Sequence, residues 1–384
     1  MSLFSAPSLT GTMYVSASYQ IMAKGLTDRV FIVGHGDGLT LNDPYQVLSV
    51  TDACKALNLD STSPLVRTLL ETYHGGCRDI WLVAAAPMSE YESDPALRDN
   101  AYYARYETRL DETYRILTDW DIIQILVVAE APFYDAHGVD FVTQLTTHCQ
   151  SSFAITGSIR LGLIGTRLGH TILPVDIGNM VNDIRLGTFG SGGKFVSIIV
   201  GEGSYNFSEM PTAYVGSAIG GVAANMATSD LRTSMVYTRL SNMISTNGSL
   251  AKAELSALTE AQLNPIMLTT KGVRGTPFQV VPITDNTLAT PGSDFWSMGQ
   301  TRLVMAVIDQ LVVLGKRYMG TIGYIQFQKD CLDFMNGLQK ANYLQSYTLN
   351  IGKETPTGTD IYVNVTLTPY VDLRQISFTA TIGP

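Results

Sequence analysis

The chain has 384 residues, which allows two or three domains because a single hydrophobic core usually stops growing at roughly 250 to 300 residues. Hydrophobic residues make up 45% and charged residues 15%, so large cores can form beneath a thinly charged surface. This composition suits either a well-packed monomer or a subunit that buries surface in an assembly. The net charge is −9 and no basic block is present, which argues against nucleic acid as the main partner.

The negative charge is concentrated in one part of the chain. Residues 51–150 contain 16 acidic and 7 basic side chains, and the rest of the chain has no net charge. We interpret this acidic stretch as a solvated outer face. Four cysteines and five histidines are scattered without the spacing of a zinc site or a disulfide framework, so a reducing cytosol is the expected place of folding. We expect neither a signal peptide nor a membrane span, because no suitable apolar stretch is present.

The predicted elements begin with a strand near the N-terminus. Met13, Val15 and Ala17 alternate with Tyr14, Ser16 and Ser18, which is a strand pattern without an adjacent hairpin partner. Residues 29–38 then predict a buried strand that ends in a glycine turn.

Strands and helices alternate through the next part of the chain. Continuous apolar strands separated by helices are typical of a mostly parallel sheet with helices on both faces. The sequence therefore predicts an α/β domain of about 250 residues. The helices are expected at 49–57, 63–73, 95–118 and 139–149, and the strands at 79–86, 121–129, 160–165 and 194–200.

The composition changes after Gly203. Residues 214–226 predict a helix rich in small residues, which indicates close helix packing. Amphipathic helices are expected at 296–314 and 325–342. Two alternating strands follow, one with Ile361, Val363, Val365 and Leu367 on one face, the other with Ile376, Phe378, Ala380 and Ile382.

Candidate catalytic motifs do not meet their requirements. The segment Thr188–Phe195 resembles a phosphate-binding loop, but it lacks the first glycine and the final Ser or Thr, and it precedes a strand. The glycine turn after residue 34 lacks a third glycine at dinucleotide-binding spacing. His35 and Asp37 could form a hydrolase triad with a distant serine, as many pairs in a chain of this length could. Asp119 and Asp121 are interpreted as turn carboxylates.

The C-terminal end is unusual because residues 376–384 carry no charged side chain. A strand edge is normally protected by charge, proline or cover. This strand either pairs within its own subunit or is donated to the sheet of another subunit. The spacing leaves both alternatives open.

Four segments resemble contractile tail sheath proteins of myophages and of pyocin-like and extracellular injection particles. Leu41–Leu57 is similar to the family's segment that leads into its first helix, and Met210–Asn242 to its "PPSGhvAGvyArtD" stretch, with Asp230 at the family's aspartate. Leu258–Thr287 and Thr366–Ile382 are similar to its later stretches. Where the family has Pro-Ala-Asn and "GArT" at the ends of two of these stretches, this sequence has other residues. These departures weaken the assignment to a subfamily more than the assignment to the sheath fold.

The resemblance implies a structural subunit, not an enzyme, that needs no cofactor and no metal. Such subunits polymerise as stacked hexameric rings around an inner tube and contract to drive the tube through the host envelope. The implied partners are other copies of the chain, the inner tail tube protein, and baseplate and tail terminator proteins. Neither nucleic acid nor direct membrane insertion is implied. The implied location is the virion tail, assembled in the bacterial host cytoplasm.

The resemblance also implies site residues and domains. The N-terminal arm and the C-terminal strand are donated to neighbouring subunits, and Lys329 and Lys340 are candidates for contact with the tube. The implied domains are an N-terminal linker arm (1–24), an outer α/β domain (25–257), an inner domain facing the tube (258–370) and a C-terminal linker strand (371–384). The donated residues are Met13, Tyr14, Val15, Ser16, Ala17, Ser18, Ile376, Ser377, Phe378, Thr379, Ala380, Thr381 and Ile382, and the receiving residues are Ile361, Val363, Val365 and Leu367. The alternative is a soluble α/β enzyme or ligand-binding protein with no recognisable site.

Overall fold

A computed structural model describes most of the chain between Arg29 and Pro369. The segments outside the description are 1–28, 59, 93, 95–96, 130–137, 157–158, 166–177, 180, 183–188, 211, 232, 247–249, 270–278, 290–296, 320–322, 354–360 and 370–384.

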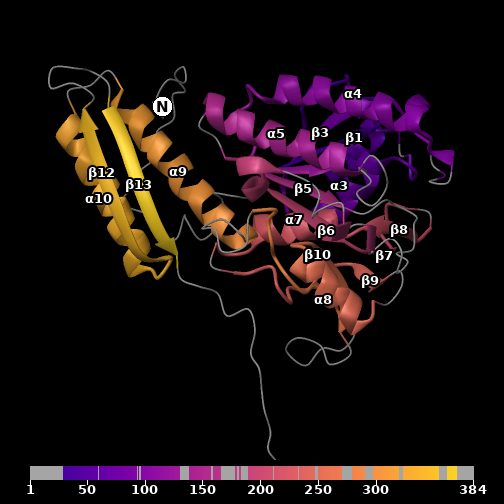
Figure 1. Ribbon diagram of the computed structural model, residues 1–384. Coiled ribbons are helices and arrows are strands. Elements are labelled where there is room, and N and C mark those ends of the chain that lie inside the picture. The colour runs from indigo at the N-terminus through magenta and orange to yellow at the C-terminus, as the bar shows by residue number, and fades with distance from the viewer. Residues whose placement is uncertain are drawn as a thin grey trace, which may run out of the picture.

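The largest feature is an eight-stranded sheet in the order β11-β10-β6-β5-β4-β1-β3-β2 (Figure 1). The six inner strands are parallel, and β2 and β11 are antiparallel at the two edges. The prediction of a mostly parallel sheet is therefore confirmed. The strands are β1 (Arg29–His35), β2 (Tyr45–Gln46), β3 (Asp79–Ala86), β4 (Ile125–Val128), β5 (Leu161–Gly165), β6 (Val196–Val200), β10 (Asn264–Thr269) and β11 (Gln279–Pro282).

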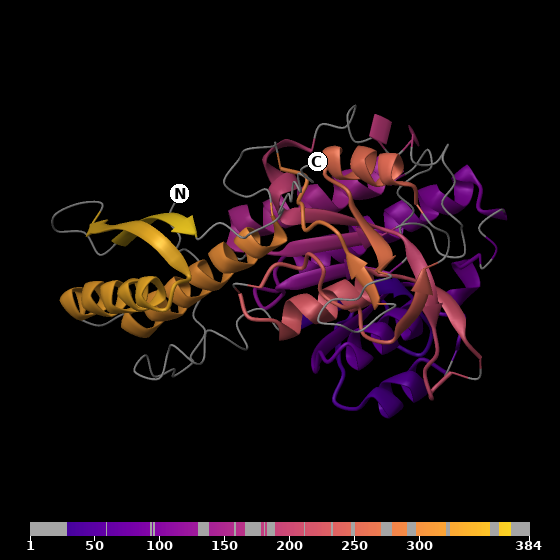
Figure 2. The ribbon, with the colours of Figure 1, turned by 90° about the horizontal axis from the view of Figure 1, so that it is seen from below.

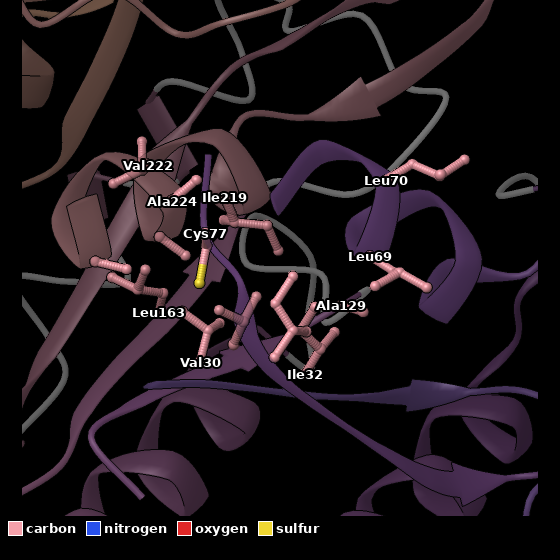
Figure 3. Packing of buried hydrophobic residues seen from close by; sticks show 14 of the residues in the cluster. Val30, Ile32, Leu69, Leu70, Cys77, Ala129, Leu163, Ile219, Val222 and Ala224 are labelled. Atoms are coloured by element: carbon pink, nitrogen blue, oxygen red, sulfur yellow. The ribbon is translucent and has the colours of Figure 1, made fainter. Parts of the chain in front are cut away.

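Helices cover both faces of this sheet because its strands are apolar on both sides. In β1, Val30 and Ile32 belong to one core and Phe31 and Val33 to the other. The first core packs against α2 (Val50–Ala56), α3 (Pro64–His74) and α7 (Ile219–Thr228), and Figure 3 shows Leu69 of α3 and Ile219 of α7 over β1. The second core packs against α4 (Asn100–Leu117), α5 (Gly138–Thr156) and α8 (Lys252–Glu260).

A three-stranded antiparallel sheet lies beside the large one. It consists of β7 (Glu202–Tyr205) between β8 (Tyr214–Ser217) and β9 (Met243–Thr246). The expected helix over 214–226 is wrong in its first turn, because residues 214–217 pair with β7 and Tyr214 stacks on Tyr205 with ring centroids 5.5 Å apart. The small residues that follow do allow close packing: a Cβ added at Gly220 would lie 2.7 Å from the Cβ of Glu71 in α3.

The C-terminal unit is a hairpin on two helices. It comprises α9 (Met298–Tyr318), α10 (Tyr324–Lys340), β12 (Leu344–Lys353) and β13 (Ile361–Pro369), around a third core. Figures 1 and 2 show the hairpin and α10 to one side of the large sheet, with α9 running from this unit into the sheet body. The helix contributes Met298 to the first core, Met305 to the second and Leu311 to the third.

The large sheet continues beyond the boundary expected at 257/258. β10 pairs in parallel with β6, and β11 pairs with β10, so the sheet ends at Pro282. The expected boundary therefore separates two strands from their own sheet.

Candidate assembly surfaces of the C-terminal unit

The β12–β13 hairpin has two outer edges that pair with no other strand in the described part of the chain. Its register runs from Leu344 opposite Pro369 to Lys353 opposite Ile361. Lys353 is the one charged residue in the two strands, so charge does not protect these edges from pairing. A two-stranded ribbon is marginally stable alone, and here packing against α9 and α10 supports it.

The expected receiving residues lie on the helix side of β13. Val363 is buried in the third core, and Ile361, Val365 and Leu367 pack against it while partly buried. These side chains therefore hold β13 on the helices of the C-terminal unit. An incoming strand would pair with the backbone of β13.

An apolar groove of about 240 Å³ runs beside β13. Neither β12 nor α10 contributes to it, so the groove lies on the side of β13 that faces α9 and the sheet body. A strand added to this edge could cover the apolar lining with one face of its side chains. The lining residues are Phe153 from α5, Ile308, Leu311 and Val312 from α9, and Val363, Asn364 and Val365 from β13.

The outer face of α10 combines positive charge with apolar side chains. Lys329 and Lys340 are both exposed. Ile325 is 80% exposed and Leu332 is 44% exposed. At 3.6 residues per turn these four positions lie close to one stripe of the helix, which is suited to a partner surface that is both acidic and apolar.

A buried charge cluster anchors the first half of α9. Arg302 is fully buried, and its Nη2 donates a hydrogen bond to the Ser229 carbonyl at 2.9 Å. Burial lowers the pKa of Arg302 to about 10, and the Asp230 and Asp285 carboxylates oppose this shift, so the guanidinium stays charged at neutral pH. The Tyr343 hydroxyl lies 3.3 Å from Asp230 Oδ2. Asp230 therefore connects α9 with the start of β12.

The candidate catalytic residues have structural roles. Burial lowers the pKa of His35 to about 3, and its ring packs 4.2 Å from the Tyr106 ring, between centroids. The Asp37 carboxylate accepts a hydrogen bond from the Met88 amide at 2.9 Å. The Ser63 hydroxyl donates to the backbone carbonyl of His35 and not to its ring. No hydrolase triad forms around His35 among the described residues.

The other candidate sites are also explained by packing. Residues Gly190–Phe195 form a 3₁₀ turn before β6, where a Cβ on Gly193 would lie 2.5 Å from the Leu288 carbonyl oxygen. Asp121 forms an ion pair with Lys316. The residues that the structure describes contain no group of three or more His, Cys, Asp or Glu that could hold a metal ion.

The predicted donor residues, 13–18 and 376–382, lie outside the described residues. Among the residues that the structure describes, α9 alone is long and apolar enough to cross a membrane, and most of its apolar stretch is buried. Its membership of three cores accounts for that composition.

Sequence comparisons give no match, either to a protein-family model or to a curated protein. Solved structures do match. A chain of the anti-feeding prophage (AFP) baseplate in its contracted state is 16% identical with a TM-score of 0.70, over 98% of this chain and 97% of that one. The PVC sheath complex of an extracellular contractile injection system, also contracted, is 11% identical with a TM-score of 0.65, over 98% of each chain.

A sheath tail protein from Listeria innocua is 8% identical with a TM-score of 0.60, over 92% of this chain and 99% of that one. These matches span both the sheet body and the C-terminal unit, because they cover nearly the whole chain. At such low identity they establish the fold and not the details of the surfaces. The chain has the fold of contractile tail sheath proteins.

Proposed function

We propose that this chain is the structural subunit of a contractile tail sheath, which polymerises as stacked hexameric rings around an inner tube and contracts to drive that tube through a host envelope. The observation that carries the proposal is a hairpin in a chain with the sheath fold: its two almost uncharged edges pair with no other described strand, and an apolar groove lies beside it. Such edges favour pairing with strands from other chains.

The connecting strands come from the two ends of the chain. Residues 13–18 and 376–382 supply alternating strands, and the β12–β13 hairpin receives them in neighbouring subunits. Ile376, Phe378, Ala380 and Ile382 then cover the apolar lining of the groove. Backbone ladders of this kind can persist while the sheet bodies rotate, so the lattice widens without subunits dissociating.

The α10 stripe contacts the inner tube in this proposal, with Lys329 and Lys340 opposite acidic groups and Ile325 and Leu332 on apolar ones. The large sheet then forms the outer domain, with its acidic 51–150 region facing outward. The C-terminal unit forms the inner domain, and residues 1–24 and 371–384 are linkers. Baseplate and terminator proteins bind the ends of the polymer, which is assembled in a bacterial host cytoplasm as part of a virion tail.

Truncation of either end tests strand donation. Proteins that lack residues 1–20 or 376–384 are expected to stay folded, with the circular dichroism and melting temperature of the full chain, because the described residues between Val30 and Leu367 already form three cores. They are expected to form no tubes by negative-stain microscopy, whereas the full chain forms tubes with a ringed surface. If either truncation unfolds the sheet body, the ends belong to their own protomer.

A matched pair of substitutions tests which face of the donated strand is buried. Phe378→Asp places a charge on the face that covers the groove and is expected to abolish tube formation. Thr379→Asp places the same charge on the opposite face and is expected to reduce tube formation less. Equal effects would contradict the groove as the receiving site. A protein that stays monomeric at every concentration and has catalytic activity would favour the alternative of a soluble enzyme.

A further inference from the structure

The turn between α4 and β4 receives contacts from three cationic side chains that are far apart in the sequence. We call this turn, residues 118–124, the β4 turn. Arg160, just before β5, is fully buried, and its Nη2 donates hydrogen bonds to the carbonyl oxygens of Thr118 and Trp120. Burial lowers the pKa of Arg160 to about 10, so the guanidinium stays charged at neutral pH and holds the start of the turn.

Arg29 binds the other end of the β4 turn. Its amide donates to the Gln124 side-chain oxygen at 3.2 Å, and its Nη1 donates to the Ile122 carbonyl oxygen at 3.3 Å. Its Nε donates to Asp79 Oδ2 in β3, on the opposite side of β1, at 2.8 Å. Arg29 therefore ties β1 to the starts of both neighbouring strands, at the residue where the N-terminal segment joins the sheet.

Lys316 connects the second half of α9 with the same turn. Its Nζ lies 3.2 Å from Asp121 Oδ2, and both side chains of this ion pair are partly exposed. The apolar groove is lined by Phe153 of α5 and Leu311 of α9, so apolar packing between these two helices is incomplete. The ion pair therefore reinforces a boundary that apolar side chains fill only in part.

We propose that the β4 turn carries mechanical load across the subunit, between the two parts that connect it to its neighbours. The inference rests on the proposed function, in which one neighbour's strand pulls on the β12–β13 hairpin and another neighbour holds the N-terminal arm. Force on the hairpin reaches α9 through the third core. It then crosses from Lys316 to Asp121 and passes through Arg29 to the arm.

This path leaves most of the sheet body outside the line of force. Between Asp121 and Arg29 the load crosses a single turn, and Arg160 fixes that turn to the start of β5. The strands β6 and β10 and the three-stranded sheet lie outside the path. The body can therefore rotate as a unit while its connections are under tension, which is what the widening of a sheath requires.

Pulling on single molecules in two directions tests the load path. One handle is attached to the N-terminus of the full chain, kept monomeric by dilution. The other is attached either to Thr348→Cys on β12 or to Lys252→Cys on α8; both positions are exposed, and the four native cysteines are buried. Force applied at residue 348 must cross α9, whereas force applied at residue 252 enters the sheet body through α8.

At constant force, Lys316→Gln is expected to shorten the time to the first rupture about twofold to fivefold when the chain is pulled from residue 348, the effect of losing one partly exposed ion pair. Pulled from residue 252, this variant is expected to match the parent. Lys316→Arg keeps the charge and is expected to restore most of the parent lifetime. Arg29→Gln is expected to shorten the lifetime in both directions, because both include the root of the arm.

Arg109→Gln is the matched control, since it removes an ion pair with Glu90 that is 2.6 Å long and similarly exposed but lies away from the β4 turn. It is expected to change neither lifetime. An unchanged lifetime of Lys316→Gln pulled from residue 348, or equal shortening in both directions, would overturn the proposed path. These measurements use the monomer, so their outcome is independent of tube formation, by which the truncations test the proposed function.

Discussion

Single buried polar groups connect segments that lie far apart in the sequence. Glu71 of α3 is buried, and burial raises the pKa of its carboxyl well above the usual value. Its Oε1 lies 3.1 Å from the Tyr214 hydroxyl of β8, which also lies 3.2 Å from the Arg67 carbonyl oxygen. The hydroxyl has one proton, so it can donate to the Arg67 carbonyl while it accepts from the Glu71 carboxyl, whose raised pKa favours the protonated form.

Tyr214→Phe is expected to lower the free energy of unfolding by about 1–3 kcal/mol, because it removes the hydroxyl that bonds to both the Glu71 carboxyl and the Arg67 carbonyl in a buried site. Urea denaturation of the monomer measures the loss. Tyr45→Phe is the control, since the Tyr45 hydroxyl makes no hydrogen bond to the described residues. Equal losses in the two variants would contradict the role of the Tyr214 hydroxyl.

At the scale of an element, two adjacent glycines of α7 have opposite surroundings. A Cβ on Gly220 would lie 2.7 Å from the Glu71 Cβ, whereas a Cβ on Gly221 would first meet Leu240 at 3.6 Å. Gly220→Ala is therefore expected to cost about 1–3 kcal/mol of unfolding free energy through overpacking. Gly221→Ala is expected to gain roughly 0.5–1 kcal/mol, because alanine favours the helix and its methyl group fits. Thermal melts of both variants check the contrast in sign.

The sequence predicted elements best where one local pattern determines them. The apolar run of β3 and the alternation of β13 needed no tertiary information. In contrast, 214–217 pairs with β7 although the residues around it favour a helix, because the cross-strand contact with Tyr205 outweighs local propensity. β12 was missed even though Tyr347, Leu349 and Ile351 alternate. The groove could not be predicted, because Phe153, Leu311 and Val363 come from three distant elements.

At the scale of the whole molecule, helix α9 connects the large sheet with the C-terminal unit. One 21-residue helix packs in all three cores, so rotation of the C-terminal unit must be transmitted through it. Its two polar anchors differ in burial: Arg302 is fully buried, while the ion pair between Lys316 and Asp121 is partly exposed at the edge of the sheet. Movement between the units is therefore expected about the Arg302 end of the helix.

Amide hydrogen exchange can distinguish donated strands from strands that pair within their own protomer. In the monomer, amides at the outer edges of β12 and β13 have no strand partner in the described structure and should exchange quickly. In tubes, the added ladders should slow exchange in peptides that cover 361–369, while β4 is protected in both states because both of its edges are paired. The variant lacking residues 376–384 should show no such gain at matched concentration. Slow exchange of the hairpin in the monomer, unchanged on assembly, would mean that its edges are already occupied by the same chain and that subunits associate through other surfaces.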